Sequence, residues 1–266
     1  MNSPTQAIEN EAIVLRDDKS GVATVTLNRP DQYNALSSVM LDTLQSEFDN
    51  IASDHSIRVV VLAANGKAFC AGHDLKEMRS SDDLEFHQAL FQKCSKMMLT
   101  INQMPQPVIA KVDGIATAAG CQLVANCDLA LASHESRFAV SGINLGLFCS
   151  TPAVPLSRNL PRKKAMEMLL TGDFISAKTA EDYALINAAV DADQLDQATQ
   201  DMAQKIAAKS ALSIQLGKDM FYKQLGMDLS NAYDYAAERM ACNMASDDAR
   251  EGVDAFIEKR KPVWNQ

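Results

Sequence analysis

The sequence predicts an α/β domain followed by a mostly helical C-terminal third. Up to about residue 150, apolar runs typical of strands alternate with patterns typical of amphipathic helices, and no linker interrupts them. Beyond that point nearly all patterns are helical. With 266 residues, 47% of them hydrophobic, the chain is long enough to bury one substantial core.

Four strands are expected in the first part of the chain. Residues 22–27 (VATVTL) alternate β-branched and small side chains, as a half-buried strand does, and residues 28–31 (NRPD) break the pattern. Continuous apolar runs indicate three strands that are covered on both faces, at residues 58–63, 108–112 and 128–132.

Helices are expected between and after these strands. Ser37 or Ser38 is a suitable N-cap for a first helix, whose apolar side chains recur at Met40, Leu41, Leu44 and Phe48. A long helix is expected at residues 84–104, and residues 114–118 lead into another that contains Gln122. The last third predicts helices at residues 162–170, 177–183, 195–208, 212–225, 229–244 and 252–259.

The last helices are rich in methionine, at Met220, Met227, Met240 and Met244. Flexible apolar side chains of this kind suit packing against other subunits. Positions in the core of the same chain are an equal alternative.

Charge limits the classes of partner. The formal net charge is −9 and the pI is about 4.9, which argues against nucleic acid or an anionic membrane as the main partner, because binding to phosphates needs a dense basic surface. An anionic ligand would therefore need a local basic cluster.

Cysteine usage and the chain start suggest a compartment. The six cysteines are scattered, form no CxxC pair and lie mostly in apolar runs, which is typical of buried thiols in a reducing compartment. The start, MNSPTQAIENEA, has neither a basic region nor an apolar one of the kind that targeting peptides carry. No apolar run reaches about 18 residues. We expect a soluble, cytoplasmic protein without membrane contact.

Two segments share a design that could serve one ligand: residues 68–78 (AFCAGHDLKEM) and 114–128 (GIATAAGCQLVANCD). Each follows an apolar strand and carries small residues, and the carboxyl ends of parallel strands lie at one edge of a sheet. Two backbone N–H groups could converge there on a carbonyl oxygen, beside the helix N-terminus at Ala119–Gly120. The alternative is that both segments are ordinary strand-to-helix turns.

Four stretches together resemble the enoyl-CoA hydratase/isomerase family, also called the crotonase superfamily: VTLNRPDQYNALSSVMLDTL, GKAFCAGHDLKEM, PVIAKVDGIATAAGCQLVANCDLALAS and RKKAMEMLLTGDFISAKTAEDYALIN. The resemblance implies a crotonase-like spiral of ββα units, expected over residues 1–200, and a helical C-terminal trimerisation region, expected over residues 201–266. It also implies an acyl-CoA thioester as ligand and a homotrimer or hexamer. Within the family, ATAAGCQLVA and GLFCSTP are most similar to one particular branch.

The resemblance also assigns roles to residues. The two oxyanion-hole amides of the family correspond to the backbone N–H groups of His73 and Ala119, with Ala118 and Ala119 standing where glycines are usual. Positions that bind coenzyme A correspond to Ala35, Ala71, Asp74, Lys76 and Lys259. Lys76 and the basic run at residues 259–261 would supply the local basic cluster. Basic residues at a helix end also favour its dipole, which is the simpler explanation of that run. We expect no metal and no cofactor apart from the coenzyme A of the substrate.

The sequence departs from the family at both catalytic carboxylates, whose positions hold Gln122 and Gly142. An amide takes up no proton near neutral pH, and glycine offers no side chain. One acid–base group is typically worth about 10²- to 10⁴-fold, so ordinary hydration should be very slow unless another group substitutes. His73, Asp74, Cys149 and Ser150 are the candidates, although packing is the simpler role for Cys149.

Three functions remain open from the sequence. The first is lyase or isomerase chemistry on an acyl-CoA thioester through an enolate stabilised by the two amides. The second is a non-catalytic acyl-CoA-binding or regulatory role. The third is isomerisation, thioester hydrolysis or decarboxylation on the same scaffold, with a carboxylate of the substrate or a bound anion acting as base. Glutamates at both 122 and 142 should raise hydratase activity if the pocket is otherwise intact.

Overall fold

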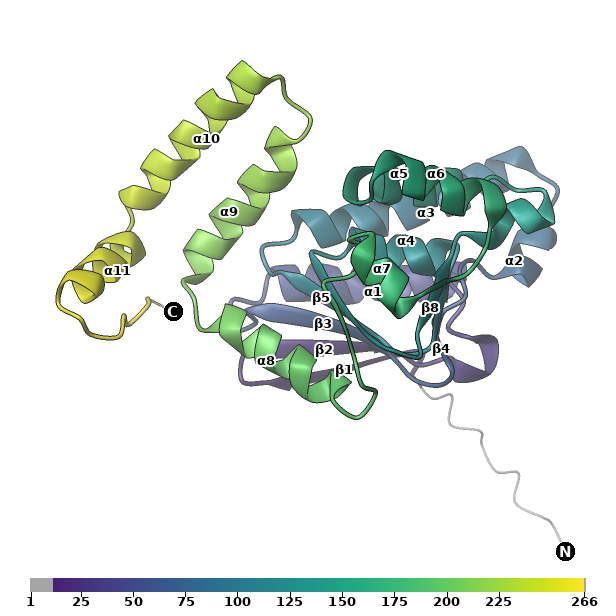
Figure 1. Cartoon of the computed structure of the whole chain (residues 1–266), viewed down its shortest axis with the longest axis horizontal. Coiled ribbons are helices and arrows are strands. Elements are labelled where there is room, and N and C mark those ends of the chain that lie inside the picture. Colours follow the sequence, from purple (N-terminus) through teal and green to yellow (C-terminus); the bar gives the residue numbers. More distant parts are fainter. Residues whose placement is uncertain (1–11, 266) are drawn as a thin grey trace, which may run out of the picture.

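The fold is built around two β-sheets of mostly parallel strands (Figure 1). The computed structural model describes residues 12–265. The expectation about the chain start falls almost entirely on residues 1–11 and so lies outside the described residues. The six-stranded sheet has the order β1 (Val14–Lys19), β2 (Val22–Leu27), β3 (Val59–Ala64), β5 (Val108–Val112), β7 (Leu129–Ser133) and β10 (Ala188–Val190). The four-stranded sheet has the order β4 (Ala68–Cys70), β6 (Ile115–Thr117), β8 (Arg137–Ala139) and β9 (Ile175–Ser176).

The chain adds one strand to each sheet in turn. β3 is followed by β4, β5 by β6 and β7 by β8, and each pair leads into helical structure. Within each sheet these successive strands are parallel neighbours, so the chain advances as a spiral of ββα units. One edge of each sheet is antiparallel: β1 pairs with β2 in the first sheet, and β9 pairs with β8 in the second. The expected fold class, a spiral of ββα units with a helical C-terminal region, is confirmed.

The helices lie where the periodicity predicts most of them. They are α1 (Ser38–Ala52), α2 (Leu75–Arg79), α3 (Leu84–Gln103), α4 (Ala119–Asn126), α5 (Ser150–Asn159), α6 (Arg162–Thr171), α7 (Ala177–Asp182), α8 (Leu195–Ala207), α9 (Ala211–Gln224), α10 (Leu229–Met244) and α11 (Asp247–Ile257). Two 3₁₀ turns, η1 (Pro30–Gln32) and η2 (Ser141–Leu145), complete them. Ser37 is the N-cap of α1, accepting a hydrogen bond from the Met40 N–H.

Each face of the six-stranded sheet is covered by different helices because neighbouring side chains on a strand point to opposite faces. One face contributes Val25, Leu27, Val60 and Leu62 to the main core, against α1, α3 and the second sheet. The other face contributes Val22, Val59 and Val61 to a smaller core with Leu195 and Ala203 of α8. This two-sided burial explains why the strands consist of continuous apolar runs.

Helices α9 to α11, residues 211–257, extend away from the spiral as an arm (Figure 1). Neither α9 nor α10 has a fully buried residue. The division expected between residues 200 and 201 falls within α8, which packs on the sheet; that division stays a prediction. In the described part of the chain no helix has both the length and the apolar character needed to cross a bilayer.

Candidate functional site

The two segments singled out in the sequence lie against each other. Strands β4 and β6 are parallel neighbours, with Cys70 opposite Ala116, so the loops that follow them leave the same edge of the second sheet. A Cβ atom built on Gly120 would overlap with the Cys70 carbonyl oxygen, and one on Gly72 would lie 3.2 Å from the Ala119 nitrogen. The two loops are therefore in van der Waals contact, which separate strand-to-helix turns would not require.

Both N–H groups assigned by the resemblance lack an acceptor among residues 12–265. Leu36 forms a bridge with this loop, in which its N–H donates to the Gly72 carbonyl at 2.7 Å and its carbonyl accepts from Asp74. His73 lies between Gly72 and Asp74, but its own N–H donates to neither the Gly72 carbonyl nor the Leu36 carbonyl. Ala119 is the first residue of α4, where N–H groups have no acceptor within the helix. The two contacting loops thus each carry one N–H donor, of His73 and of Ala119, that has no acceptor among the described residues.

Ala118 holds a backbone conformation that side chains rarely adopt, with φ 50° and ψ −120°. Its N–H donates to the Ala139 carbonyl, and its own carbonyl accepts from Gln122, so hydrogen bonds on both sides fix this conformation. Strain of this kind typically costs about 1–3 kcal/mol and persists where the surroundings impose it. The strained residue directly precedes the Ala119 N–H, whose direction it sets.

The His73 side chain turns inward rather than into solvent. Its Nδ1 lies 3.3 Å from the Leu36 carbonyl, and its ring packs edge-on against Phe91 of α3 at 5.4 Å between centroids. A carbonyl can only accept, so this contact assigns the proton to Nδ1. Nε2 is buried without a partner among the described residues. Burial lowers the pKa of His73 below its usual value of 6.5, and the Leu36 carbonyl and Glu77 offset only part of this lowering. The imidazole is therefore neutral at pH 7.

Gln122 lies one turn into α4 and is only 4% exposed. Its Oε1 atom has no hydrogen-bond partner in the part of the chain that is described. A buried amide oxygen without a partner is costly, so such a group commonly serves a ligand or a bound water. Gln122 is therefore a candidate for hydrogen bonding to a ligand or a bound water through Oε1.

Gly142 lies in η2, and the turn is closed by the Leu147 N–H, which donates to the Gly142 carbonyl at 3.0 Å. Cys149 is buried directly behind it, at the N-cap position of α5. Burial raises the pKa of the Cys149 thiol, so a thiolate nucleophile is not favoured. Ser150 is exposed and directs its hydroxyl to the Phe148 carbonyl at 3.3 Å.

The expected coenzyme A positions near the first loop are close to one another. The Ala71 N–H donates to the Tyr33 carbonyl, which joins the segment before Ala35 to the loop of Ala71. The Asp74 carboxylate is the N-cap of α2, accepting from the Lys76 and Glu77 N–H groups. Lys76 itself is exposed on this short helix.

Sequence reasoning missed Asn34, whose fully buried side chain holds this region together. Its amide donates to the carbonyls of Asn65 and Ala68, and its oxygen accepts from the Arg29 N–H at 2.8 Å. Asn34 has a positive φ of 53°, a conformation that asparagine adopts more readily than most residues. An asparagine between a turn and a buried segment was the available signal.

Lys259 is not part of this group within one chain. It follows α11 at the end of the arm, whereas α2 lies at the other end of the molecule (Figure 1). The neighbouring Arg260 is paired with Glu251 and Glu258 at 2.6 Å each. The basic run therefore supplies less free positive charge than the sequence suggests.

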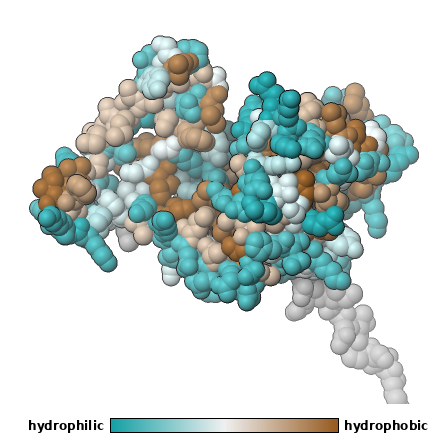
Figure 2. All heavy atoms as spheres, viewed as in Figure 1, coloured by the Kyte–Doolittle hydropathy of each residue, from teal (hydrophilic) through white to brown (hydrophobic). Residues whose placement is uncertain are grey.

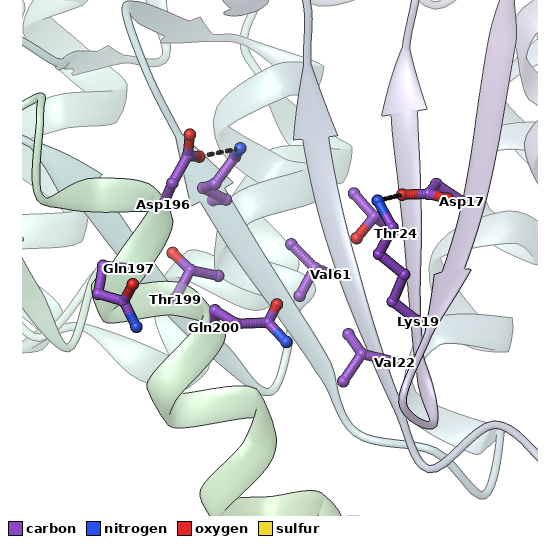
Figure 3. A pocket seen from close by; sticks show the side chains of 10 residues that line it. Asp17, Lys19, Val22, Thr24, Val61, Asp196, Gln197, Thr199 and Gln200 are labelled. Carbon is purple, nitrogen blue, oxygen red and sulfur yellow. Dashed lines mark hydrogen bonds and ion pairs between the residues drawn. The ribbon is translucent and has the colours of Figure 1, made fainter.

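A cavity of about 440 Å³ lies elsewhere, between α8 and the six-stranded sheet (Figure 3). Its wall includes Val22 and Val61, which face α8 and not the main core. Its charged side chains pair with each other, Lys19 with Asp17 at 2.7 Å and Lys111 with Asp196 at 2.5 Å. None of the expected site residues lines it, so it is separate from the amide pair.

Comparisons with known proteins agree with this geometry. The model of the enoyl-CoA hydratase/isomerase family matches residues 17–266. Enoyl-CoA hydratase domain-containing protein 3 of Mus musculus is 47% identical over 247 residues, 93% of this chain and 82% of that protein. The human protein of this name is 47% identical over 92% of this chain and 81% of its own length. This is the branch that ATAAGCQLVA and GLFCSTP indicate, and that interpretation is confirmed.

Solved structures extend the agreement to the fold. An enoyl-CoA hydratase from Mycobacterium smegmatis superposes with a TM-score of 0.94 and 54% identity, covering 96% of this chain and all of that one. Human enoyl-CoA hydratase domain-containing protein 3 superposes with a TM-score of 0.92 and 45% identity, over 95% of this chain and 100% of that one.

The expectation of a cytoplasmic location is wrong by the same comparisons. The mouse, rat and human relatives all carry the word mitochondrial in their names. The expectation rested on the unpaired cysteines, on the composition of residues 1–12 and on the lack of a long apolar run; the described cysteines are free thiols. Free thiols are common in every reducing compartment, so they do not distinguish one such compartment from another.

Proposed function

Because this chain belongs to the enoyl-CoA hydratase/isomerase family, we propose that it binds an acyl-CoA thioester and stabilises an enolate-like form of that thioester. The observation that carries this proposal is the contact between two loops, each with an N–H group that has no acceptor among the described residues, at His73 and Ala119. Two such donors suit one oxygen that gains negative charge during a reaction, and each is typically worth about 2.7 to 4 kcal/mol.

Three side chains close to this amide pair carry no charge, although Glu77 lies near enough to act on His73. Gln122 carries a neutral amide, burial favours a neutral His73, and burial favours a protonated Cys149. Few groups are then left to move a proton to or from the thioester, which leaves ordinary hydration slow. Lyase or isomerase chemistry is the first interpretation of the site, with Gln122 orienting the substrate or a water through its Oε1, which has no partner among the described residues.

Two other functions use the same geometry. Non-catalytic acyl-CoA binding is favoured by Gln122 and Gly142, because this site keeps the two N–H donors but lacks both catalytic carboxylates of the family. A reaction in which a carboxylate of the substrate supplies the electrons, such as decarboxylation, also needs no protein base to form the enolate. The amide pair would stabilise that enolate in the same way.

Coenzyme A would lie along the first loop. We assign its adenine to the backbone beside Ala35, Ala71 and Asp74, and its phosphates to Lys76. The Asp74 carboxylate is occupied with capping α2, which keeps this part of the backbone in one position for the ligand. Lys259 could reach the phosphates only from another copy of the chain, given its place at the far end of the arm.

Assembly into a homotrimer or hexamer is supported by the surface of the arm. Figure 2 shows apolar surface along this region. The exposed apolar side chains include Phe221, Leu225, Leu229, Met240, Phe256 and Ile257. Such an extent of exposed apolar surface usually marks a site of association. Sedimentation equilibrium measures the subunit number, and a monomer at micromolar concentration would reject the assembly.

The experiment that tests the function combines binding with turnover. Calorimetry with acetyl-, butyryl- and crotonyl-CoA measures binding, and a panel of 2-enoyl, 3-enoyl and 2-carboxyacyl thioesters measures reactions. Binding with turnover of one class assigns the chemistry, and binding without turnover supports the non-catalytic function. A folded protein that binds no CoA thioester at all would reject the proposal in every form.

A further inference from the structure

Residue 142, where the family has its second catalytic carboxylate, is a glycine, and neighbouring atoms already occupy the space that a side chain would need. A Cβ atom built on Gly142 would lie 2.7 Å from the Cys149 sulfur and 2.8 Å from the Leu147 carbonyl oxygen. Real Cβ atoms essentially never come closer than about 3.0 Å to another heavy atom. Any side chain at residue 142 would therefore displace the thiol, the Leu147 carbonyl, or both.

The surrounding turn is held in this shape by its own hydrogen bonds. The Leu147 N–H donates to the Gly142 carbonyl at 3.0 Å, and the Gly146 N–H donates to the Ile143 carbonyl at 3.1 Å. Gly146 has a φ of 76°, which suits a turn of this kind. The Leu147 carbonyl is thus fixed by the backbone of this turn. The Cys149 thiol is the one of the two obstacles that a side-chain substitution can remove.

The turn lies beside the amide pair. The Ser141 hydroxyl is 2.9 Å from the Thr117 hydroxyl, and Thr117 directly precedes Ala118 and Ala119. Gly142 follows Ser141, so the turn that holds Gly142 is joined by this contact to the segment that carries the second donor. Cys149 is 8% exposed, so its thiol fills space inside the protein and not at the surface.

We propose that Cys149 is a specificity-determining residue, whose thiol fills the space where a side chain at residue 142 would stand and limits the width of the acyl end of the site. The steric part of this inference rests on geometry alone. The selectivity part rests on the proposed function, since it takes the space beside Gly142 to receive the acyl group. The ligand class it favours is a linear short-chain acyl thioester over one branched near the carbonyl.

A double-mutant cycle tests the steric part without any ligand. Gly142→Ala should lower the midpoint of thermal unfolding by about 5 °C, as overpacking in a filled interior does. In a Cys149→Ala background the same change should cost about half as much, because the Leu147 carbonyl remains. Combined with Cys94→Ala, another buried thiol, Gly142→Ala should cost the same as it does alone. Additivity of Gly142→Ala and Cys149→Ala would overturn the proposal.

Calorimetry tests the selectivity part. Cys149→Ala should improve binding of 3-methylbutyryl-CoA relative to butyryl-CoA by about tenfold, the usual effect of one methyl group in a pocket. Cys149→Ser, which keeps an atom in the same place, should retain the wild-type ratio within about twofold. An unchanged ratio in Cys149→Ala, with both thioesters bound, would reject the specificity role. If no thioester binds the wild type, the proposed function fails, the selectivity claim falls with it, and the unfolding cycle still decides the steric claim.

Discussion

Gly120 of α4 packs so closely against Cys70 of β4 that a Cβ atom at Gly120 would overlap with the Cys70 carbonyl oxygen. This contact joins the end of one short strand to the start of the helix that follows its neighbour. The first two residues of α4 are thereby held against the loop of Gly72 and His73. The spacing between the two free N–H groups depends on this contact.

We therefore predict that Gly120→Ala severely destabilises the protein. The added methyl meets backbone, which cannot move without displacing β4, and overpacking of a filled interior typically costs about 1–3 kcal/mol or more. Gly217→Ala is the matched control, because Gly217 is also in a helix and, apart from its chain neighbours and the backbone of that helix, no atom of residues 12–265 lies within 4 Å of its Cβ position. It should be neutral or stabilising by up to about 1 kcal/mol. Chemical unfolding compares the two, and equal stabilities would contradict the contact.

Gly72→Ala should weaken the binding of an acyl-CoA thioester strongly and lower the free energy of unfolding only moderately. Its methyl would lie 3.2 Å from the Ala119 nitrogen and 2.9 Å from the Ala118 Cβ, and so would cover the second donor. Loss of one such donor typically lowers turnover by about 10²- to 10³-fold. Gly146→Ala carries the same positive-φ strain with nothing within 4 Å, so it controls for strain alone. Affinity for butyryl-CoA is the measurement, and equal losses in both variants would refute a role for the Ala119 N–H.

Ala118→Gly should stabilise the protein by about 1 kcal/mol. Glycine adopts φ 50° and ψ −120° without the steric cost that alanine has there, although it loses more entropy on folding. Ala125→Gly, inside the helix that Ala118 precedes and without positive φ, should destabilise instead. A loss of stability in Ala118→Gly, measured by urea unfolding, would show that Ala118 is not strained.

The sequence predicts most of the long elements of this fold, but it misses β1 and α5 as well as most of the short ones. The strand β5 was expected at its observed residues 108–112, because the run VIAKV after Pro107 is apolar except for Lys111. Strands β4, β6 and β8 have three residues each, too few to display a period, yet they form the sheet that carries both amide loops. Their positions depend on neighbours far away in the sequence.

Part of the candidate site could likewise be predicted from local sequence, and part of it could not. Residues near His73 and Ala119 could be named from local strings, since both donors belong to the backbone and need only the right loops. The closure of residue 142 could not, because it arises where Cys149 and the Leu147 carbonyl fold back over Gly142. Nor could the distance of Lys259 from α2, which depends on the direction of the arm.

That closure changes the expected result of restoring the family carboxylates. Gln122→Glu with Gly142→Glu should leave hydratase activity at background, since the glutamate at 142 meets the Cys149 thiol and the Leu147 carbonyl. The measurement is crotonyl-CoA hydration, with Gln122→Glu alone as the comparison. Activity of the double variant well above that of the single one would show that the turn opens easily.

Gln122→Glu alone should make stability depend on pH. Gln122 is 4% exposed and its Oε1 has no partner among residues 12–265, so burial would raise the pKa of a carboxyl placed there above the usual value near 4.3. A folded-state pKa above the unfolded one means that the stability is present at low pH and is lost as pH rises through the raised value. The variant should match the wild type near pH 4. Toward pH 8 its free energy of unfolding should fall below that of the wild type, by about 1.4 kcal/mol for every tenfold difference between the folded and unfolded acid dissociation constants. A pH-independent difference would mean that the carboxylate finds a partner.

The arm is attached to the spiral by a buried ion pair. Lys218 of α9 is 2.7 Å from the Asp128 carboxylate, and their side chains are 7% and 14% exposed. The Lys218 ammonium also donates to the carbonyls of Ile101 and Gln106, and Tyr222 donates to Asp128 at 2.8 Å. Burial lowers the pKa of Lys218, and the attraction of Asp128 opposes this shift. One side chain of α9 thus satisfies three acceptors of the spiral.

Lys218→Met should therefore destabilise the protein by about 3–5 kcal/mol, because it leaves the Asp128 charge and two carbonyls buried without their donor. Lys223→Met is the matched control: Lys223 pairs with Asp219 on the same helix, but it is exposed, so little change is expected. Adding Asp128→Asn to Lys218→Met should recover part of the loss, since no buried charge then remains unpaired. Urea unfolding gives the stabilities, and sedimentation shows whether a loosened arm changes assembly. If Lys218→Met is as stable as Lys223→Met, the ion pair does not hold the arm, and the contacts of α9 with α3 must do so instead.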